Sequence, residues 1–179
     1  MRTRSFVFAV SLLCVCLVTA SLAQQEDKSK RPSPPGTAQV TLKGKTITID
    51  YSRPFMRGRK IMGGLVPYGK VWRTGANAAT SLTTDTALDI AGTHLPAGNY
   101  TLYTVPGEKS WQLIVNKQTG QSGLSYDKAQ DLGRAPMNMS KPPAPVETYK
   151  ITLSSAGGNR GNLQMEWADM VASAPFTVK

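Results

Sequence analysis

Thiol and imidazole groups are nearly absent from this chain of 179 residues, which has two cysteines, Cys14 and Cys16, and one histidine, His94. Zinc sites draw three or four ligands from cysteine, histidine and carboxylate side chains, and a Ser–His–Asp triad needs a histidine beside its nucleophile. His94 lies in a turn-like Gly-Thr-His-Leu-Pro segment, and no Gly-x-Ser-x-Gly motif or phosphate-binding glycine loop accompanies it. The sequence therefore gives no catalytic residue, no metal-ligand set and no cofactor motif.

Long apolar runs are also lacking. Residues 6–18 are almost wholly apolar, follow Arg2 and Arg4, and precede small residues that end at Ala23. A membrane-spanning helix needs roughly 20 apolar residues, whereas a charged start, a short apolar stretch and a small-residue cleavage site are typical of a secretory signal. We expect residues 1–23 to be a cleaved signal peptide and the remainder to be exported to the periplasm or beyond, with no transmembrane segment.

Cleavage at this site removes both cysteines, so the exported chain would have neither a disulfide nor a thiolate. The signal carries two of the 21 basic residues and none of the 11 acidic ones, which leaves 19 basic residues and a net charge of +8. Without disulfides the chain depends on its core. A chain of about 150 residues buries roughly 70% of its unfolded surface, so a single core over the remaining length suffices.

Helical periodicity is missing from the rest of the chain. Residues 24–37 are polar and rich in proline, which predicts a disordered leader. From residue 38 onward, apolar and polar residues alternate in short segments between Gly and Pro turns, and this pattern is typical of β-strands. The sequence predicts an all-β protein, with a single antiparallel β-sandwich or jelly-roll-like domain over residues 38–179 and one long irregular loop over residues 53–80.

Acidic residues are lacking between Asp50 and Asp85, where six basic residues occur among aromatic ones. The guanidinium fork suits carboxylate, phosphate or sulfate, and aromatic faces stack on sugars or bases. This segment predicts a surface that binds an anionic or polar small molecule or a glycan. The candidate ligand-binding residues are Arg53, Arg57, Arg59, Tyr68, Trp72, Arg73 and Asn77.

Other interpretations of the same segment remain open. Arginines of long loops often brace the loop by hydrogen bonding to backbone carbonyls, and guanidinium groups tied up in this way would argue against a ligand. A structural or protein-interaction module of the cell envelope is an alternative function, and it predicts an exposed apolar patch. An enzyme acting on a carbohydrate or ester is a second alternative, with Tyr51 or Tyr68 acidified by neighbouring arginines. No nucleic-acid recognition motif occurs, so we expect no nucleic-acid partner, and nothing indicates an oligomeric state.

Two groups of motifs have a distinctive order. The first comprises residues 51–54 (YSRP), 57–61 (RGRKI), 64–77 (GLVPYGKVWRTGAN) and Thr80; the second comprises residues 95–104 (LPAGNYTLYT), 106–108 (PGE), Trp111 and 116–117 (NK). Together they resemble the signature of an exported bacterial family catalogued as Domain of Unknown Function 2911. The resemblance implies an exported β-sandwich with no assigned activity. It also implies one departure: the family has a glutamate after Gly-Ala-Asn where this chain has Ala78, so any role of that carboxylate is lost here.

Overall fold

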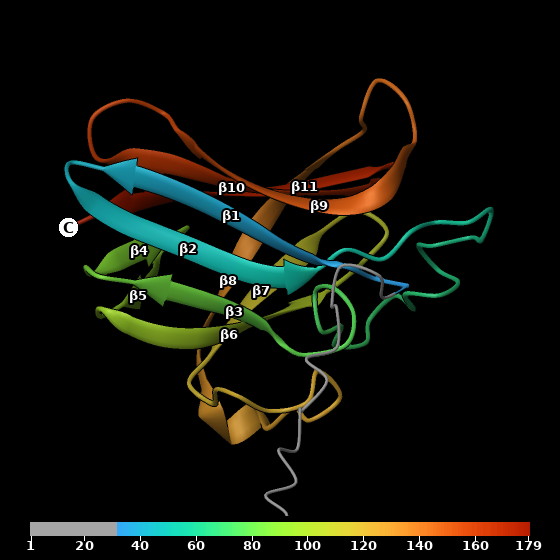
Figure 1. Ribbon diagram of the computed structural model, residues 1–179, viewed down its shortest axis with the longest axis horizontal. Helices are drawn as coiled ribbons and strands as arrows, with labels where there is room; N and C mark the ends of the chain where they lie inside the picture. Colours follow the sequence, from blue (N-terminus) through green and yellow to red (C-terminus); the bar gives the residue numbers. More distant parts are fainter. Residues whose placement is uncertain (1–31) are drawn as a thin grey trace, which may run out of the picture.

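The computed structural model describes residues 32–179 (Figure 1). The expected signal peptide and most of the expected leader lie outside the described residues, so export remains a prediction. The expected disordered leader over residues 24–37 ends too late in the chain, because the first strand begins at Pro35. Residues 35–37 pair in register with the next strand, and the Thr37 hydroxyl donates to Asp50 Oδ1 at 2.6 Å. These bonds offset the entropy cost of ordering a segment with no large apolar side chain.

Antiparallel β-strands account for nearly all the regular structure, which confirms the predicted fold class. The elements in chain order are β1 (Pro35–Leu42), β2 (Lys45–Ser52), β3 (Thr80–Thr84), β4 (Leu88–Ile90), β5 (Thr93–Leu95), β6 (Gly98–Val105), β7 (Trp111–Asn116), the 3-10 turn η2 (Lys128–Gln130), β8 (Asp131–Ser140), β9 (Val146–Ser155), β10 (Arg160–Ala168) and β11 (Met170–Val178).

The strands form one sheet in the order β1-β2-β3-β6-β7-β8-β11-β10-β9, with β4 and β5 attached to β11. This sheet curls until its two ends approach each other, and Figure 1 shows β1 lying between β2 and the β9–β10 pair. The Tyr51 hydroxyl on β2 accepts a hydrogen bond from Ile151 N of β9 at 3.0 Å. The sandwich-like core predicted from the sequence is therefore enclosed by a nearly closed, barrel-like sheet.

The core follows from the alternation of apolar residues along the strands. On β2, for example, Ile47, Ile49 and Tyr51 are buried, while the residues between them are partly or fully exposed. Burying one such aliphatic side chain contributes about 1.5–3 kcal/mol. An aromatic group fills one end of the barrel, where Trp111, Tyr149 and Trp167 are each at most 1% exposed.

Strands β3 and β4 are separated by a turn over residues 85–87. Thr84 Oγ1 donates to Thr86 O at 2.8 Å, and this local bond turns the chain out of β3. Strand β4 then pairs with β5 and with the end of β11. In the turn between β3 and β4, the Asp85 carboxylate accepts from Thr46 N at 3.0 and 3.1 Å.

Residues 53–79 cross one end of the barrel between β2 and β3, seen as the teal and green loops in Figure 1. Ile61, Met62 and Val66 are buried there, so the segment packs onto the core as its apolar residues predict. Trp72 pairs with Thr104 of β6 through two backbone hydrogen bonds of 2.8 and 3.0 Å. The irregular segment is thereby fixed against a regular strand. Among residues 32–179, no helix has the length and apolarity needed to cross a membrane.

Candidate binding cavity

A cavity of about 400 Å³ opens where the 53–79 segment meets β6, β10 and the segment that follows β7. Residues from all four regions line it, so it exists only in the folded sheet. Its aromatic and charged lining consists of Arg59, Trp72, Arg73, Tyr103, Tyr126 and Trp167.

The aromatic wall is built around Trp72. Its ring stacks on Trp167 with centroids 5.9 Å apart and planes at 16°, and it meets Tyr149 edge-on at 5.1 Å. Trp111 completes the group at 6.2 Å from Trp72. Each such pair contributes about 0.5–1.5 kcal/mol beyond its buried area. Because the Trp72 backbone is also paired with Thr104, this wall is rigid before any ligand arrives.

A second wall comes from Tyr103 on β6 and Tyr126 in the segment after β7, whose rings meet at 5.0 Å and 67°. The Tyr103 hydroxyl donates to Ser125 O at 2.6 Å and accepts from Gln121 Nε2 at 3.0 Å. These bonds attach residues 121–126 to the outer face of β6. Tyr126 therefore has a fixed place in the lining.

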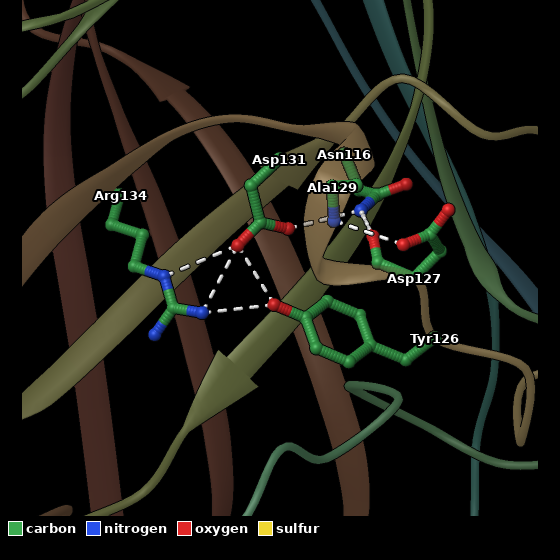
Figure 2. Close-up of polar contacts among 6 residues, drawn as sticks. All are labelled: Asn116, Tyr126, Asp127, Ala129, Asp131 and Arg134. Atoms are coloured by element: carbon green, nitrogen blue, oxygen red, sulfur yellow. Dashed lines mark hydrogen bonds and ion pairs between the residues drawn. The ribbon is translucent and has the colours of Figure 1, made fainter.

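Tyr126 is held by a charged network that Figure 2 shows in full. Its hydroxyl donates to Asp131 Oδ2 at 2.7 Å and accepts from Arg134 Nη2 at 2.8 Å, while Arg134 Nε and Nη2 both donate to that same carboxylate oxygen at 3.2 and 3.0 Å. Burial and the hydrogen bond to Asp131 raise the pKa of Tyr126 to about 12. The phenol therefore stays protonated at neutral pH and keeps its hydrogen bond to Asp131.

Asn116, which is fully buried, extends this network into the preceding strand. Its Nδ2 donates to Asp127 O at 2.8 Å and to Asp131 Oδ1 at 2.9 Å (Figure 2). Asp127 in turn caps η2 by accepting from Ala129 N at 2.9 Å. The segment between β7 and β8 is thus fixed at both ends, and the tyrosine wall with it.

Three of the seven predicted ligand-binding residues, Arg59, Trp72 and Arg73, come together in this cavity. Both arginines are also hydrogen bonded to their own loop. Arg59 donates from Nε to Met56 O at 3.0 Å and from Nη2 to Phe55 O at 2.6 Å, and Arg73 donates from Nε to Gly75 O at 3.4 Å. Within residues 32–179 no hydrogen bond occupies the Nη1 atom of either arginine. These bonds to backbone carbonyls are the outcome that the bracing interpretation predicts and that argues against a ligand, although the unbonded Nη1 of each guanidinium still carries two donor hydrogens.

The other four predicted residues do not join the cavity. Arg53 donates to Pro35 O at 3.1 Å, Arg57 donates to Pro32 O at 3.5 Å, and Asn77 donates to Ser33 O at 3.1 Å. These three side chains brace the segment against the start of the described chain, as the bracing interpretation predicted. Tyr68 lines a separate cavity of about 280 Å³. Whether any of the seven binds a ligand remains a prediction.

Sequence reasoning missed Tyr103, Tyr126 and Trp167, because they are far from the basic segment in the chain. It also missed Gly123, which allows the two loops to approach closely. A Cβ at this position would lie 2.7 Å from Arg73 Cδ and 2.7 Å from the Asn77 carbonyl oxygen. A single glycine between Ser122 and Leu124 carries no such signal by itself.

Four exposed residues line the cavity, of which three are apolar and the fourth is Arg59. The apolar residues Leu65, Val71 and Leu124 are 50%, 38% and 82% exposed, respectively. In the described part of the chain, no aspartate or glutamate is among the lining residues. Among residues 32–179, no three histidine, cysteine or carboxylate side chains gather closely enough to hold a metal ion. The cavity thus combines cationic, aromatic and aliphatic surfaces.

Comparison with known proteins identifies a family over most of the chain. The family described as "Protein of unknown function (DUF2911)" matches residues 33–176. This range contains every residue that lines the cavity. No curated protein and no solved structure matches the chain.

Proposed function

Because the chain belongs to the DUF2911 family, whose description assigns no function, we propose a role from the cavity itself: the protein is a binding module for a small anionic or polar molecule or a glycan. One observation carries this proposal. Two arginines of the basic segment, Arg59 and Arg73, lie in the same cavity as the stacked Trp72 and Trp167 rings. Its volume of about 400 Å³ is within the range of roughly 300–1,000 Å³ typical of small-molecule sites.

Preorganisation supports the same role. Ordering a long side chain on binding costs about 0.5–1.5 kcal/mol. Trp72 is already stacked, Tyr126 is already bonded to Asp131 and Arg134, and Arg73 already donates to its own loop. A guest that enters therefore orders few protein groups, so more of its contact energy appears as affinity.

The geometry favours binding over turnover. A tyrosine acting as acid or base works best with a pKa near the ambient pH, whereas the pKa of Tyr126 is raised to about 12. The two tyrosines considered for catalysis lie elsewhere: Tyr51 bonds to the backbone of Ile151, and Tyr68 lines another cavity. Within the described residues, no carboxylate lines the cavity to serve as a partner.

A protein-interaction module of the cell envelope is the second candidate. Leu124 is 82% exposed and Leu65 is 50% exposed at the mouth of the cavity, and exposed apolar groups that cluster favour contact with a partner. In that case a partner side chain, rather than a free molecule, would occupy the cavity.

A thermal-shift screen of the purified protein against small carboxylates, sulfates and sugars tests the proposal. A ligand at 100 times its Kd adds about 2.7 kcal/mol of stability, which raises the Tm of a domain of this size by roughly 5–10 °C. The shift should disappear in Arg73→Gln and persist in Arg160→Gln, since Arg160 lies outside this cavity. A screen in which no compound raises the Tm of the parent protein would refute a small-molecule role.

A further inference from the structure

The exposed apolar residues that line the cavity limit the chemical class of ligand that it can bind. Four large hydrophobic side chains are exposed among residues 32–179, and three of them, Leu65, Val71 and Leu124, line this one cavity. Exposed apolar residues that are scattered singly need no explanation, but these three come from two segments about fifty positions apart and meet at one opening. These three side chains provide an apolar surface that continues onto the Trp72 wall.

A glycan fits this surface poorly. Sugar rings carry hydroxyl groups around their edges, and a hydroxyl buried without a hydrogen bond costs about 1–3 kcal/mol. Leu65, Val71 and Leu124 offer no side-chain donor or acceptor. An aliphatic or aromatic body would bury the same surface favourably, at about 25 cal/mol per Å².

The charge in the cavity favours an anionic group on the guest. Among residues 32–179, Arg59 and Arg73 are the charged side chains of the lining, and no carboxylate of this range lies there to balance them. Arg73 is half-buried and packs against Gly123, and a partly desolvated cation gains most from a partner of opposite charge. Its Nη atoms make no hydrogen bond within residues 32–179, so they can donate to a carboxylate or a sulfonate in the bidentate manner typical of arginine.

We propose that the cavity binds an amphipathic anion, with one carboxylate or similar head on Arg73 and an apolar body between Trp72 and the Leu124 side. This inference rests on the proposed binding function and selects one of its ligand classes. Size sets the body. A dry cavity of about 150 Å³ holds one benzene ring, so about 400 Å³ accommodates a fused bicyclic ring or a short acyl chain together with its head.

Isothermal titration calorimetry with three probes tests the ligand class. The probes are 2-naphthoate, its neutral isostere 2-naphthamide, and the neutral disaccharide cellobiose. We expect 2-naphthoate to bind at least ten times more tightly than the amide, and cellobiose to give no heat of binding. Raising the salt concentration should weaken the acid and leave the amide unchanged, because salt screens the head group alone.

Matched variants assign the two parts of the site. Arg73→Gln should weaken 2-naphthoate about tenfold without changing 2-naphthamide, and the unchanged amide would show that the cavity is intact. Leu124→Ser should weaken both probes, and it places a polar group at a position already 82% exposed. Arg160→Gln, which removes a cation outside this cavity, should change neither.

Each outcome has a distinct meaning. Equal affinity for acid and amide would overturn the anionic head while leaving a binding module. Binding of cellobiose without either naphthalene probe would overturn the amphipathic anion and favour the glycan class of the proposed function. Failure of all three probes, together with an unresponsive thermal-shift screen, would overturn both proposals.

Discussion

Replacing Tyr126 with Phe tests whether the charged network in Figure 2 holds the cavity wall in place. The substitution removes one hydroxyl and keeps the ring that packs on Tyr103 at 5.0 Å. Two hydrogen bonds disappear, one of 2.7 Å to the Asp131 carboxylate and one of 2.8 Å from Arg134. Asp131 keeps its bonds to Arg134 and Asn116, so no buried charge is left without a partner.

Burial and the retained partners set the size of the effect. A hydrogen bond to a charged group contributes about 1.5–3 kcal/mol when buried. The side chain of Asp131 is 12% exposed and that of Arg134 is 33% exposed, so solvent compensates part of the loss. We expect Tyr126→Phe to lower the free energy of unfolding by about 1–2 kcal/mol, which corresponds to a Tm lower by roughly 2–8 °C.

Urea denaturation followed by tryptophan fluorescence measures this change, and Tyr68→Phe is the matched control. Tyr68 is 38% exposed, and surface substitutions of this kind usually change stability by less than about 0.5 kcal/mol. A double-mutant cycle with Arg134→Gln should give a coupling energy of about 0.5–2 kcal/mol. Equal stability of the two Phe variants, or a coupling energy of zero, would refute a stabilising role for the network.

Three further predictions concern the same framework. The pKa of Tyr126 is raised in the folded state, so the protonated hydroxyl stabilises the fold below the unfolded pKa of 10.0, and this contribution is lost as the pH rises toward about 12. The parent protein should therefore lose stability over this pH window more steeply than Tyr126→Phe in pH-dependent urea melts. Gly123→Ala should cost about 1–3 kcal/mol in thermal melts, because its Cβ would collide with Arg73 and the Asn77 carbonyl; an unchanged Tm would show that the loops separate freely. Tyr51→Phe should cost about 1–3 kcal/mol by leaving Ile151 N without its partner, and unaltered hydrogen exchange at that amide would contradict the contact between β2 and β9.

Local sequence patterns specified much of the β framework, and long-range pairing decided the rest. The hairpin of β1 and β2 follows from alternation across a Lys43-Gly44 turn, both residues of which have positive φ. Strand β8 was not assigned from the sequence, because Gly133 and Pro136 interrupt its pattern. The structure tolerates the proline since the ladder to β11 begins only at Asn138, which leaves Pro136 with a registered partner on the β7 side alone.

Only those residues of the candidate site that lie in one segment of the chain could be predicted from the sequence. Arg59, Trp72 and Arg73 belong to one segment, and its shortage of acidic residues drew attention to them. Trp167 and Tyr103 reach the same cavity through the curl of the sheet and the order of its strands. No spacing along the chain encodes that closure.

Two interpretations of the basic segment, bracing and ligand contact, were alternatives in the sequence, and the structure shows the bracing bonds directly. Arg53 and Arg57 donate to backbone carbonyls outside the cavity, whereas Arg59 and Arg73 donate to carbonyls of their own loop and still line it. Bracing and ligand contact are therefore compatible in one arginine. The bracing bond fixes the guanidinium and lowers the entropy cost of the next bond that it makes.

The indole N–H signals of the three tryptophans provide the most direct measurement of the central claim that this cavity receives a guest. Trp72 and Trp167 line the cavity, whereas Trp111 lines a different one. In a ¹⁵N-labelled sample titrated with 2-naphthoate, the account predicts saturable shifts of the Trp72 and Trp167 indole signals that exceed any shift of Trp111. Signals that stay in place, or a response confined to Trp111, would contradict it.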